Sequence, residues 1–515
     1  MADQQNADET TFTLSPQAGI KRDGTNLEGE NCSDGQWVRF QRNKPKKMGG
    51  FRRVTDALTG PVRKLLVWSR KDLNAVVSFS SSKVETLLVD SNFVGNDIHD
   101  RTPSSGFTAS ANNVWTADTQ YDDAVGSQGT IIVAHCNQSM TNIDDDTATK
   151  PYWALASSTT SLFQTITDAP AVSGGVFSLA PYTVLLGSDG YVAWSDVNQP
   201  QVWAGSTTPG DAGADRITGA KLVAGLPLRA GKLAAMLWSL DSVLRMDWIG
   251  GSQIFSFTPL STQSSILAQN SVIEYDGTYF WIGVDRFLYF DTSVKELPND
   301  LNQNYFFDNL NYAYRQKVWA TKVPRFGEIW WFYPRGDATE CSHAVIFNVR
   351  LKTWYDVELP RSAGYYSQVL RYPSWVGADV EPSGDYGFYQ HEFGKNAIVG
   401  DNETAIRSYY TTQNFGLPTG GVADSQQGLN RWTRLVRVEP DFIQSGDMTC
   451  TVIGHEFAQS EEVAEAPLSF SPTDGKIDMR TQQRHIQLKF ESNVLNGFFE
   501  AGKVIIHTEP GDNRS

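Results

Sequence analysis

The sequence predicts a mainly β protein: a β-propeller of six or seven small antiparallel sheets, an additional small antiparallel β domain and one short inserted helix. Three observations indicate this. A strand–turn–strand unit recurs over residues 61–400, with starts roughly 45 to 65 residues apart, the range of propeller blades. Aromatic residues make up 12% of the chain, with 15 tryptophans, and large flat side chains suit sheet-on-sheet packing. The 43 glycines and 22 prolines supply the turns that short strands need.

The clearest unit is Glu328 to Glu358. Ile329 to Tyr333 is an unbroken apolar and aromatic run, typical of a strand covered on both faces, because half-exposed strands alternate. Ala344 to Phe347 and Trp354-Tyr355 supply a second and a third strand. A small sheet with apolar faces is not stable alone. We therefore expect a neighbouring sheet on each of its faces.

Residues 1–60 are predicted to form an N-terminal arm and basic leader. Met1 to Thr11 is polar and is expected to be disordered or extended, and Gln36 to Gln41 is a strand candidate. Basic residues dominate from Arg39 to Lys64, against a formal net charge of −15 for the chain. We predict an interface with a neighbouring subunit or an acidic partner; a solvated surface paired with local acids and, less so, DNA binding are the alternatives. The predicted interface residues are Trp37, Arg39, Arg42, Lys44, Lys46 and Lys47.

The propeller is predicted to occupy residues 61–400. Besides the unit at Glu328, repeats are expected at Leu65 to Asp90, Thr130 to Ala156, Thr183 to Trp203, Leu233 to Phe257 and Val272 to Asp291, with a seventh at Ala363 to Val369 plus Tyr386 to His391. Stacking small sheets radially gives each a neighbour on both faces and leaves short edges. No WD or Gly-His signature marks the blades, so a set of ordinary β-sandwiches remains the alternative.

One segment breaks the β pattern, and the C-terminal part has a different character. Asn299 to Ala320 places its apolar residues on a helical stripe and is predicted to be a helix of two or three turns between blades. Residues 401–515 are predicted to form the small antiparallel β domain, for which a sandwich is one arrangement. A loop is expected at Asn414 to Asn430. The expected strands of this domain are Arg431 to Asp441, Met448 to Ile453, Ile486 to Phe490 and Lys503 to His507.

Composition limits the function classes. With 43 Lys and Arg against 58 Asp and Glu, attraction of the whole chain to nucleic acid is not expected. The four cysteines are far apart in sequence, which favours reduced residues in a protein made in the cytoplasm over a disulfide framework or a zinc site. We expect no signal peptide and no membrane-spanning segment.

Sequence motifs for catalysis are missing. There is no G-x-S-x-G, H-E-x-x-H, P-loop or G-x-G-x-x-G after a strand, so no catalytic, cofactor-binding or metal-binding residue is predicted, and no cofactor. His135 is expected to be structural or at the surface, and Asp144 to Asp146 a solvated loop rather than a cation site. Ser188-Asp189-Gly190 is expected to be a hairpin turn rather than part of a sialidase box. Because paired carboxylates for glycoside hydrolysis are not recognisable from sequence, the prediction of a non-enzyme leaves that possibility open.

Two parts of the chain resemble a known family. The leader carries Leu14-Ser15-Pro16, Gly19-Ile20, Arg22-Asp23, Asp34-Gly35-Gln36-Trp37-Val38-Arg39-Phe40, Pro45, Lys47 and Gly49-Gly50-Phe51. Later come Glu328 to Pro334, Trp432 through Pro440-Asp441-Phe442, and Arg484 to Gly511. These resemble the tail nozzle, or hub (stabilisation), proteins of short-tailed bacteriophages (podoviruses), whose leader is a Pro-Gly, Asp-Gly-x-x-Val-Arg-Phe, Pro-x-Lys-x-Gly-Gly-Trp string. Ala18 and Phe51 depart from it at one Gly and the Trp position.

The resemblance implies a structural subunit with a β-propeller and a platform-like β domain, assembled as a ring, usually a hexamer, at the end of the virion tail. Its implied partners are further copies of itself, a tail adaptor, tail fibre or plug/needle proteins, and duplex DNA that passes through without sequence-specific binding. Assembly would take place in the host bacterial cytoplasm. Net acidity suits such a conduit, since an acidic lumen repels DNA phosphates.

Two other hypotheses stand beside this one. The first is a carbohydrate-binding or carbohydrate-cleaving propeller of a phage receptor-binding tail protein, because sugar sites combine aromatic rings with carboxylates. The second is a cellular scaffold like the WD proteins, which ranks last because the blade signatures are missing.

Overall fold

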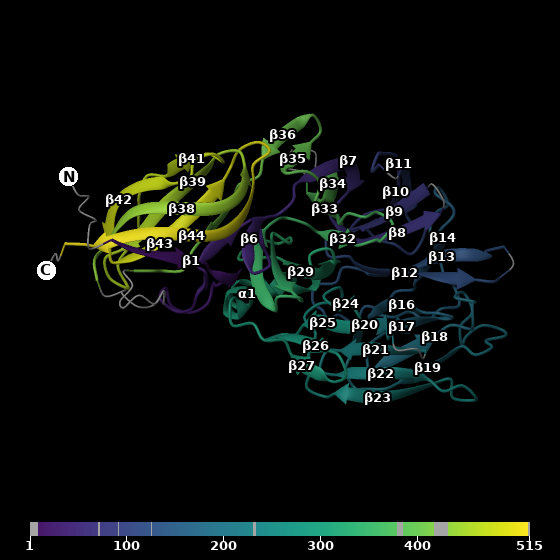
Figure 1. The fold of residues 1–515 in the computed structure, drawn as a ribbon. Coiled ribbons are helices and arrows are strands. Elements are labelled where there is room, and N and C mark those ends of the chain that lie inside the picture. Colours follow the sequence, from purple (N-terminus) through teal and green to yellow (C-terminus); the bar gives the residue numbers. More distant parts are fainter. Residues whose placement is uncertain are drawn as a thin grey trace, which may run out of the picture.

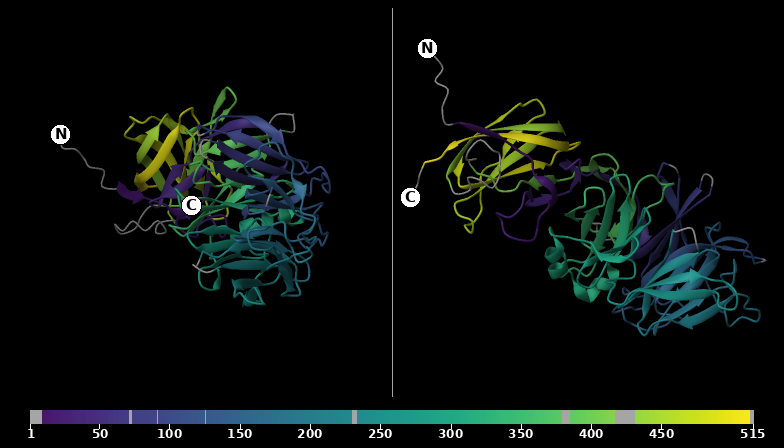
Figure 2. Two further views of the ribbon diagram at one scale, coloured as in Figure 1. Left: turned by 90° about the vertical axis from the view of Figure 1, so that its right-hand side faces the viewer. Right: turned by 60° about the horizontal axis from the view of Figure 1, so that its bottom comes forward.

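The computed structural model describes residues 9–70, 73–90, 92–124, 126–229, 233–378, 385–416 and 431–512. Two β units lie side by side, a seven-bladed β-propeller and a β-sandwich (Figures 1 and 2). In Figure 1 the inner strands of the blades surround a common centre, so the view runs approximately along the propeller axis. The predicted fold class, a propeller with a small β domain and a short helix, is confirmed.

Six blades each form from one contiguous stretch of chain, and their strands are numbered from the axis outward. The first three are β8 (Val62–Arg70), β9 (Leu73–Ser80), β10 (Val84–Val89) and β11 (Gly95–Asp100); β12 (Val114–Asp122), β13 (Gly129–Asn137), β14 (Tyr152–Leu155) and β15 (Gln164–Thr165); and β16 (Gly175–Leu179), β17 (Tyr182–Leu186), β18 (Tyr191–Trp194) and β19 (Gly213–Arg216).

The next three blades repeat this antiparallel order. They are β20 (Leu222–Pro227), β21 (Ala234–Ser239), β22 (Val243–Trp248) and β23 (Phe255–Ser261); β24 (Ile273–Tyr275), β25 (Thr278–Ile282), β26 (Phe287–Phe290) and β27 (Val294–Glu296); and β28 (Trp319–Val323), β29 (Glu328–Tyr333), β30 (His343–Asn348) and β31 (Thr353–Glu358).

The seventh blade combines two distant parts of the chain. β32 (Ala363–Tyr365), β33 (Ser374–Ala378) and β34 (Asp385–His391) supply its inner strands, and β7 (Phe51–Thr59) pairs antiparallel with β34 as the fourth. A hairpin of β35 (Asn396–Val399) and β36 (Asn402–Ala405) extends this sheet, with β35 parallel to β7. Because β7 leads directly into β8 of the first blade, this pairing closes the ring.

Apolar clusters fill the spaces between neighbouring blades, and they explain why β29 is apolar from Ile329 to Tyr333. Its six residues are all buried. Ile329, Trp331 and Tyr333 pack in the cluster shared with the fifth blade. Trp330 and Phe332 point the other way, into the cluster shared with the seventh blade and the sandwich. A strand covered on both faces was predicted here, and both coverings are present.

The inserted helix has about the two turns that were predicted, but it covers only part of the predicted segment. α1 (Gln303–Asn309) is followed by extended backbone at Leu310, and a 3₁₀ turn, η1, spans Tyr312–Lys317. The predicted helix ran on to Ala320, but Trp319 and Ala320 belong to β28, the innermost strand of the sixth blade. The C-terminal part of the segment thus forms a strand, because pairing of β28 with β29 outweighs the helical spacing of its apolar residues.

Other strand predictions need correction. Most predicted units lacked the innermost or the outermost strand of the blade, since these strands are short or mixed in polarity. Gln201 to Trp203 was predicted as a strand, yet β19 (Gly213–Arg216) takes the outer position of that blade. The loop prediction at Asn414 to Asn430 falls largely outside the described residues, as does most of the arm predicted at Met1 to Thr11.

The sandwich contains strands from both ends of the chain. One sheet contains β42 (Ile477–Gln483), β38 (Thr433–Ser445), β44 (Phe498–Pro510), β6 (Lys44–Lys47), β5 (Val38–Gln41) and β1 (Thr10–Leu14). The other contains β4 (Asp34–Gln36), β37 (Ser408–Thr411), β43 (His485–Ser492), β39 (Met448–His455), β40 (Val463–Ala464) and β41 (Leu468–Phe470). β2 (Gln17–Ile20) and β3 (Asn31–Cys32) form a separate parallel pair.

The predicted leader, residues 1–60, is therefore divided between the two units: β1, β4, β5 and β6 complete the sandwich, and β7 completes the propeller. One continuous apolar cluster runs from the sandwich core into the sixth and seventh blades. Within the described residues, no helix is long and apolar enough to cross a membrane. The four cysteines are free and buried.

Candidate functional site

The leader places Arg39 at the junction of propeller and sandwich. Arg39 lies on β5 and is almost fully buried. Its Nε and Nη2 donate to Glu328 of β29 at 2.8 and 3.1 Å, and its Nη1 and Nη2 donate to Glu392 at 2.7 and 2.6 Å. The guanidinium also lies 3.6 Å from the ring centre of Phe326. One planar side chain thus holds two carboxylates of the propeller from a strand of the sandwich.

Glu328 is fully buried, with 0% exposure, so its charge needs partners. Besides Arg39 it accepts hydrogen bonds from Tyr355 Oη at 2.7 Å and Trp330 Nε1 at 2.9 Å. Burial alone would lower the pKa of Arg39, but the Glu328 and Glu392 carboxylates raise it above its ordinary value. Burial and Glu328 likewise raise the pKa of Tyr355. Arg39 and Tyr355 therefore each keep one charge state near neutral pH.

Arg22 makes a second link of the same kind. Its Nε and Nη2 donate to Asp356 of β31 at 2.9 and 3.1 Å, and Nη2 also donates to the Gly35 carbonyl at 3.0 Å. Nη1 pairs with Asp34, which lies on β4 of the sandwich. The two leader arginines thus hold the same blade at two of its strands.

Glycines let the leader backbone approach the propeller closely. Gly19 has φ +116°, and a Cβ there would lie 2.4 Å from side-chain atoms of Leu301 and Thr353. A Cβ on Gly50 would lie 2.3 Å from the Asn396 carbonyl oxygen. Side chains at these positions would separate the leader from the propeller.

The predicted interface residues divide into two groups. Trp37, Arg39 and Lys47 are buried inside the chain, and Trp37 Nε1 donates to the Gly49 carbonyl at 3.1 Å. The prediction of a contact with another subunit is wrong for these three, because the junction inside one chain already covers them. Arg42, Lys44 and Lys46 remain partly or fully exposed, paired with Glu500, Ser15 and Gln41 respectively.

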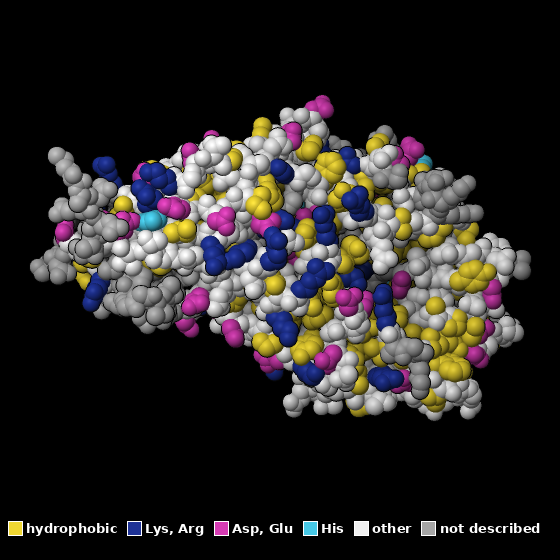
Figure 3. All heavy atoms as spheres, in the orientation of Figure 1, with side chains coloured by type: hydrophobic (Ala, Val, Ile, Leu, Met, Phe, Trp, Pro, Cys, Tyr) yellow, Lys and Arg dark blue, Asp and Glu magenta, His cyan; other side chains and the backbone are white. Residues whose placement is uncertain are grey.

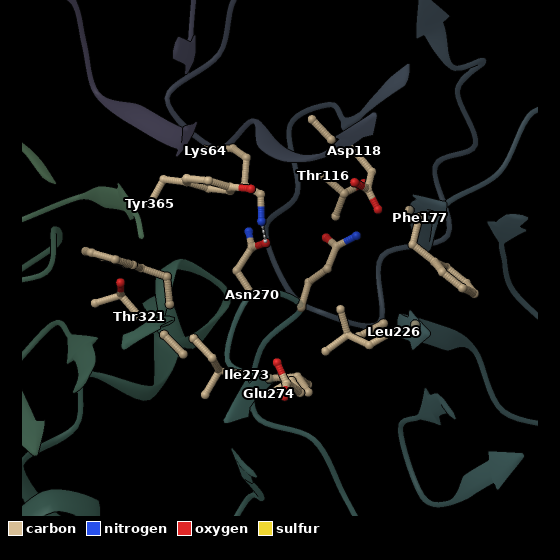
Figure 4. Close-up of a pocket in the computed structure, with 18 of the residues that line it drawn as sticks. Lys64, Thr116, Asp118, Phe177, Leu226, Asn270, Ile273, Glu274, Thr321 and Tyr365 are labelled. Carbon is tan, nitrogen blue, oxygen red and sulfur yellow. Dashed lines mark hydrogen bonds between the residues drawn. The ribbon is translucent and has the colours of Figure 1, made fainter. Parts of the chain in front are cut away.

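A second site, which sequence analysis missed, lies on the propeller axis. A cavity of about 450 Å³ is lined by residues of the innermost strand of every blade. Figure 4 shows Lys64, Tyr365 and Asp118 on one side of it, Asn270 near its middle and Glu274 on the other side. No sequence signal identified these residues, because they come from distant parts of the chain.

One end of the axis is closed by a loop of the second blade. Met140 and Ile143 are buried in a cluster with residues of the fourth and fifth blades. Lys221 Nζ donates to the Ile143 carbonyl at 3.0 Å, and Gln316 Nε2 donates to the Met140 carbonyl at 3.4 Å. Arg63 and Lys317 both pair with Glu340 beside it. The cavity is therefore blind at this end.

The opposite end meets solvent. Arg229 lines the cavity and its side chain is 72% exposed. Glu274 pairs with Lys322 at 3.1 Å and lies 3.6 Å from Arg229. Against the effect of burial, the backbone N–H of Gly277 and these two cations lower its pKa. The mouth thus carries two cations around one carboxylate.

The other sequence candidates have structural roles. His135 is buried, with Nε2 at 3.1 and 3.0 Å from the carbonyl oxygens of Thr149 and Val172, and burial lowers its pKa to about 4. Asp144 and Asp146 are exposed in the loop that closes the axis. Among the described residues, no group of three or more His, Cys, Asp or Glu side chains is arranged to hold a metal ion.

Comparisons with known proteins add the following. No protein-family model matches the chain, and no curated protein matches it. The chain is similar to an exo-β-1,3-galactanase from Phanerochaete chrysosporium (10% identity, 90% of this chain and 100% of that one, TM-score 0.28). It is also similar to the computationally designed Ika8 protein (12% identity, 73% of this chain and 99% of that one, TM-score 0.34). A third similar structure is the WD40 domain of Toxoplasma gondii coronin (10% identity, 75% of this chain and 86% of that one, TM-score 0.33). These TM-scores are too low to support an argument about function.

Proposed function

We propose that this protein is a virion structural protein without catalytic activity, a subunit of a ring-shaped tail nozzle that forms a conduit for genomic DNA at the end of a short phage tail. The observation that carries the proposal is the position of the leader string that resembles this family. Arg22, Gly35, Arg39 and Gly50 of that string all lie where the leader joins sandwich to propeller.

A joined two-part subunit suits a conduit under load. Domains linked only by a flexible segment move relative to each other by default. Here buried ion pairs and a shared apolar cluster hold the units together. A ring of such subunits would transmit force from an adaptor above it to fibres or a plug around it.

The conduit in this proposal lies between copies of the chain. The axis of each propeller is closed at one end by the loop that carries Met140 and Ile143. Duplex DNA therefore would pass through the centre of the ring of subunits, and not through a single propeller.

The test is the assembly state of the full chain. Native mass spectrometry and negative-stain microscopy of the purified protein, alone and with the tail adaptor of the same virus, are expected to show a closed ring, a hexamer in the simplest case. Mass spectrometry of purified virions should detect the chain in the tail. A strict monomer with the adaptor present, absent from virions, would overturn the proposal.

The alternative, a carbohydrate-binding or carbohydrate-cleaving propeller, has support from the axial cavity, where Asp118 and Glu274 place carboxylates near Tyr365 and Phe177. A glycan array and a capsule-degradation assay address it directly. Two negative results would remove this alternative.

A further inference from the structure

The axial cavity has the form of a small-molecule site. It is enclosed by all seven blades, blind at one end and open at the end where Arg229 meets solvent. Its volume of about 450 Å³ falls within the roughly 300–1,000 Å³ typical of ligand pockets. Leu226, Ile273 and Phe177 line separate parts of the cavity, and Lys64, Tyr365 and Asn270 form a polar wall (Figure 4).

The polar wall contains a cation with few partners. Lys64 Nζ points into the cavity toward Asn270 Oδ1 (Figure 4), but the two atoms are 3.4 Å apart, longer than an ordinary hydrogen bond. No ion pair joins Lys64 to any carboxylate in the described part of the chain. Burial lowers the pKa of Lys64. Two of the three ammonium N–H groups are thus left to the cavity, at a cost in free energy.

Asp118 lies on the same side of the cavity as Lys64 (Figure 4). Its Oδ1 accepts the backbone N–H of Thr119 at 2.8 Å, and its Oδ2 accepts that of Ser178 at 3.0 Å. These bonds orient the carboxylate and leave further lone pairs free. Burial raises the pKa of Asp118, and Lys64 acts in the opposite direction. An ammonium and a carboxylate therefore face a shared space without touching.

Among the residues that line the cavity, positive charge exceeds negative charge. The cations are Arg63, Lys64, Arg229 and Lys322, against the carboxylates of Asp118 and Glu274. This excess stands out in a chain of formal net charge −15. Lys and Arg side chains also spread across the middle of the face seen in Figure 3. A mouth with excess cations concentrates small anions.

We propose that the axial cavity binds a small organic carboxylate that also carries hydrogen-bond donors. Its carboxylate pairs with Lys64, and Tyr365 and Asn270 lie beside that pair. Its donors, hydroxyl or ammonium, reach Asp118. A sugar acid and an amino acid share this chemistry. The inference does not depend on the ring assembly proposed above.

The experiment uses the full chain and defined probes: glucuronate and glutamate as the two ligand types, with glucose as the neutral comparison. Isothermal titration calorimetry and ligand-detected NMR are expected to show saturable binding of at least one acid and none of glucose. Lys64→Met should weaken that binding by at least about tenfold, because it removes the charge-assisted hydrogen bond. Lys295→Met, which removes an exposed cation paired with Asp291, is the matched control and should change nothing.

A second variant separates the two ligand types. Asp118→Asn should weaken the binding of glutamate much more than that of glucuronate. The ion pair with the ammonium group of glutamate is lost, whereas the amide oxygen of asparagine still accepts a hydrogen bond from a hydroxyl of glucuronate. Thermal unfolding of each variant confirms folding, and Lys64→Met should be at least as stable as the parent. The inference is overturned if neither acid binds at up to about 10 mM, or if binding is the same in Lys64→Met. Loss of binding with an intact ring would leave the proposed function untouched.

Discussion

The six contiguous blades and the seventh blade are built differently. Each of the first six pairs strands that follow one another in sequence, as β28 to β31 do. The seventh takes β7 from the leader, more than 300 residues before its neighbour β34 in the numbering used here. The sandwich is also built from distant parts of the chain, because β1, β4, β5 and β6 of the leader lie among its C-terminal strands. Pairing of consecutive strands thus builds the first six blades, and the leader strands complete the seventh blade and the sandwich.

The largest effect is expected from breaking the junction at Arg39. Arg39→Met leaves the buried carboxylate of Glu328 without its cation, and removing one partner of a buried pair costs about 3–5 kcal/mol. Chemical denaturation should show this loss in the free energy of unfolding, and hydrogen exchange should show the sandwich opening separately from the propeller. A loss below about 1 kcal/mol would mean that the apolar cluster alone holds the junction.

A paired substitution compares ring closure with an ordinary blade. Leu58 on β7 and Leu185 on β17 are both fully buried, so Leu58→Ala and Leu185→Ala should each cost about 3 kcal/mol. The two substitutions should loosen different blades. Hydrogen exchange is expected to quicken in the first and seventh blades for Leu58→Ala, and around the third blade for Leu185→Ala. Identical exchange patterns would contradict a special role for β7.

A smaller effect, of opposite sign, is expected at Lys47. Its Nζ is buried and finds no hydrogen-bond partner among the described residues; burial, with Lys395 nearby, lowers its pKa to about 8. Between pH 8 and the ordinary lysine value the unfolded chain binds more protons, so stability rises with pH there, and the penalty is complete below pH 8.

Lys47→Met removes this penalty. It should raise the free energy of unfolding by about 1 kcal/mol at pH 7, with the gain fading above pH 8. Denaturation at pH 7 and at pH 10 measures it. A destabilised variant, or a gain independent of pH, would be inconsistent with a buried charged ammonium.

The smallest effect is expected at Arg42. It lies between β5 and β6 and pairs with Glu500 of β44 in the same sheet, but its side chain is 78% exposed. Arg42→Ala should change the free energy of unfolding by less than about 0.5 kcal/mol. It therefore serves as the matched control for Arg39→Met. If it lowers ring formation in native mass spectrometry while stability is unchanged, Arg42 lies at a subunit contact, as the sequence predicted.

Local pattern was enough to predict the blades. The run Ile329 to Tyr333 indicated a strand with both faces covered, and the structure supplies a neighbour on each face. The basic leader was predicted to contact another subunit, but Trp37, Arg39 and Lys47 are buried inside their own chain. Charge density suggests a partner for a segment, and does not say whether that partner belongs to the same chain. Glu328 and Glu392, the partners of Arg39, are about 290 and 350 residues away.

The sequence by itself determined the β class and the repeated small sheets, because strand periodicity and turn residues act over a few positions. Only the tertiary structure decided how the ring closes, where the leader lies and what faces the axis. Lys64, Asp118 and Glu274 come from three different blades, and their shared cavity exists only after the sheets have closed around it. Such long-range placement depends on the sum of many packing contacts, which no short stretch of sequence encodes.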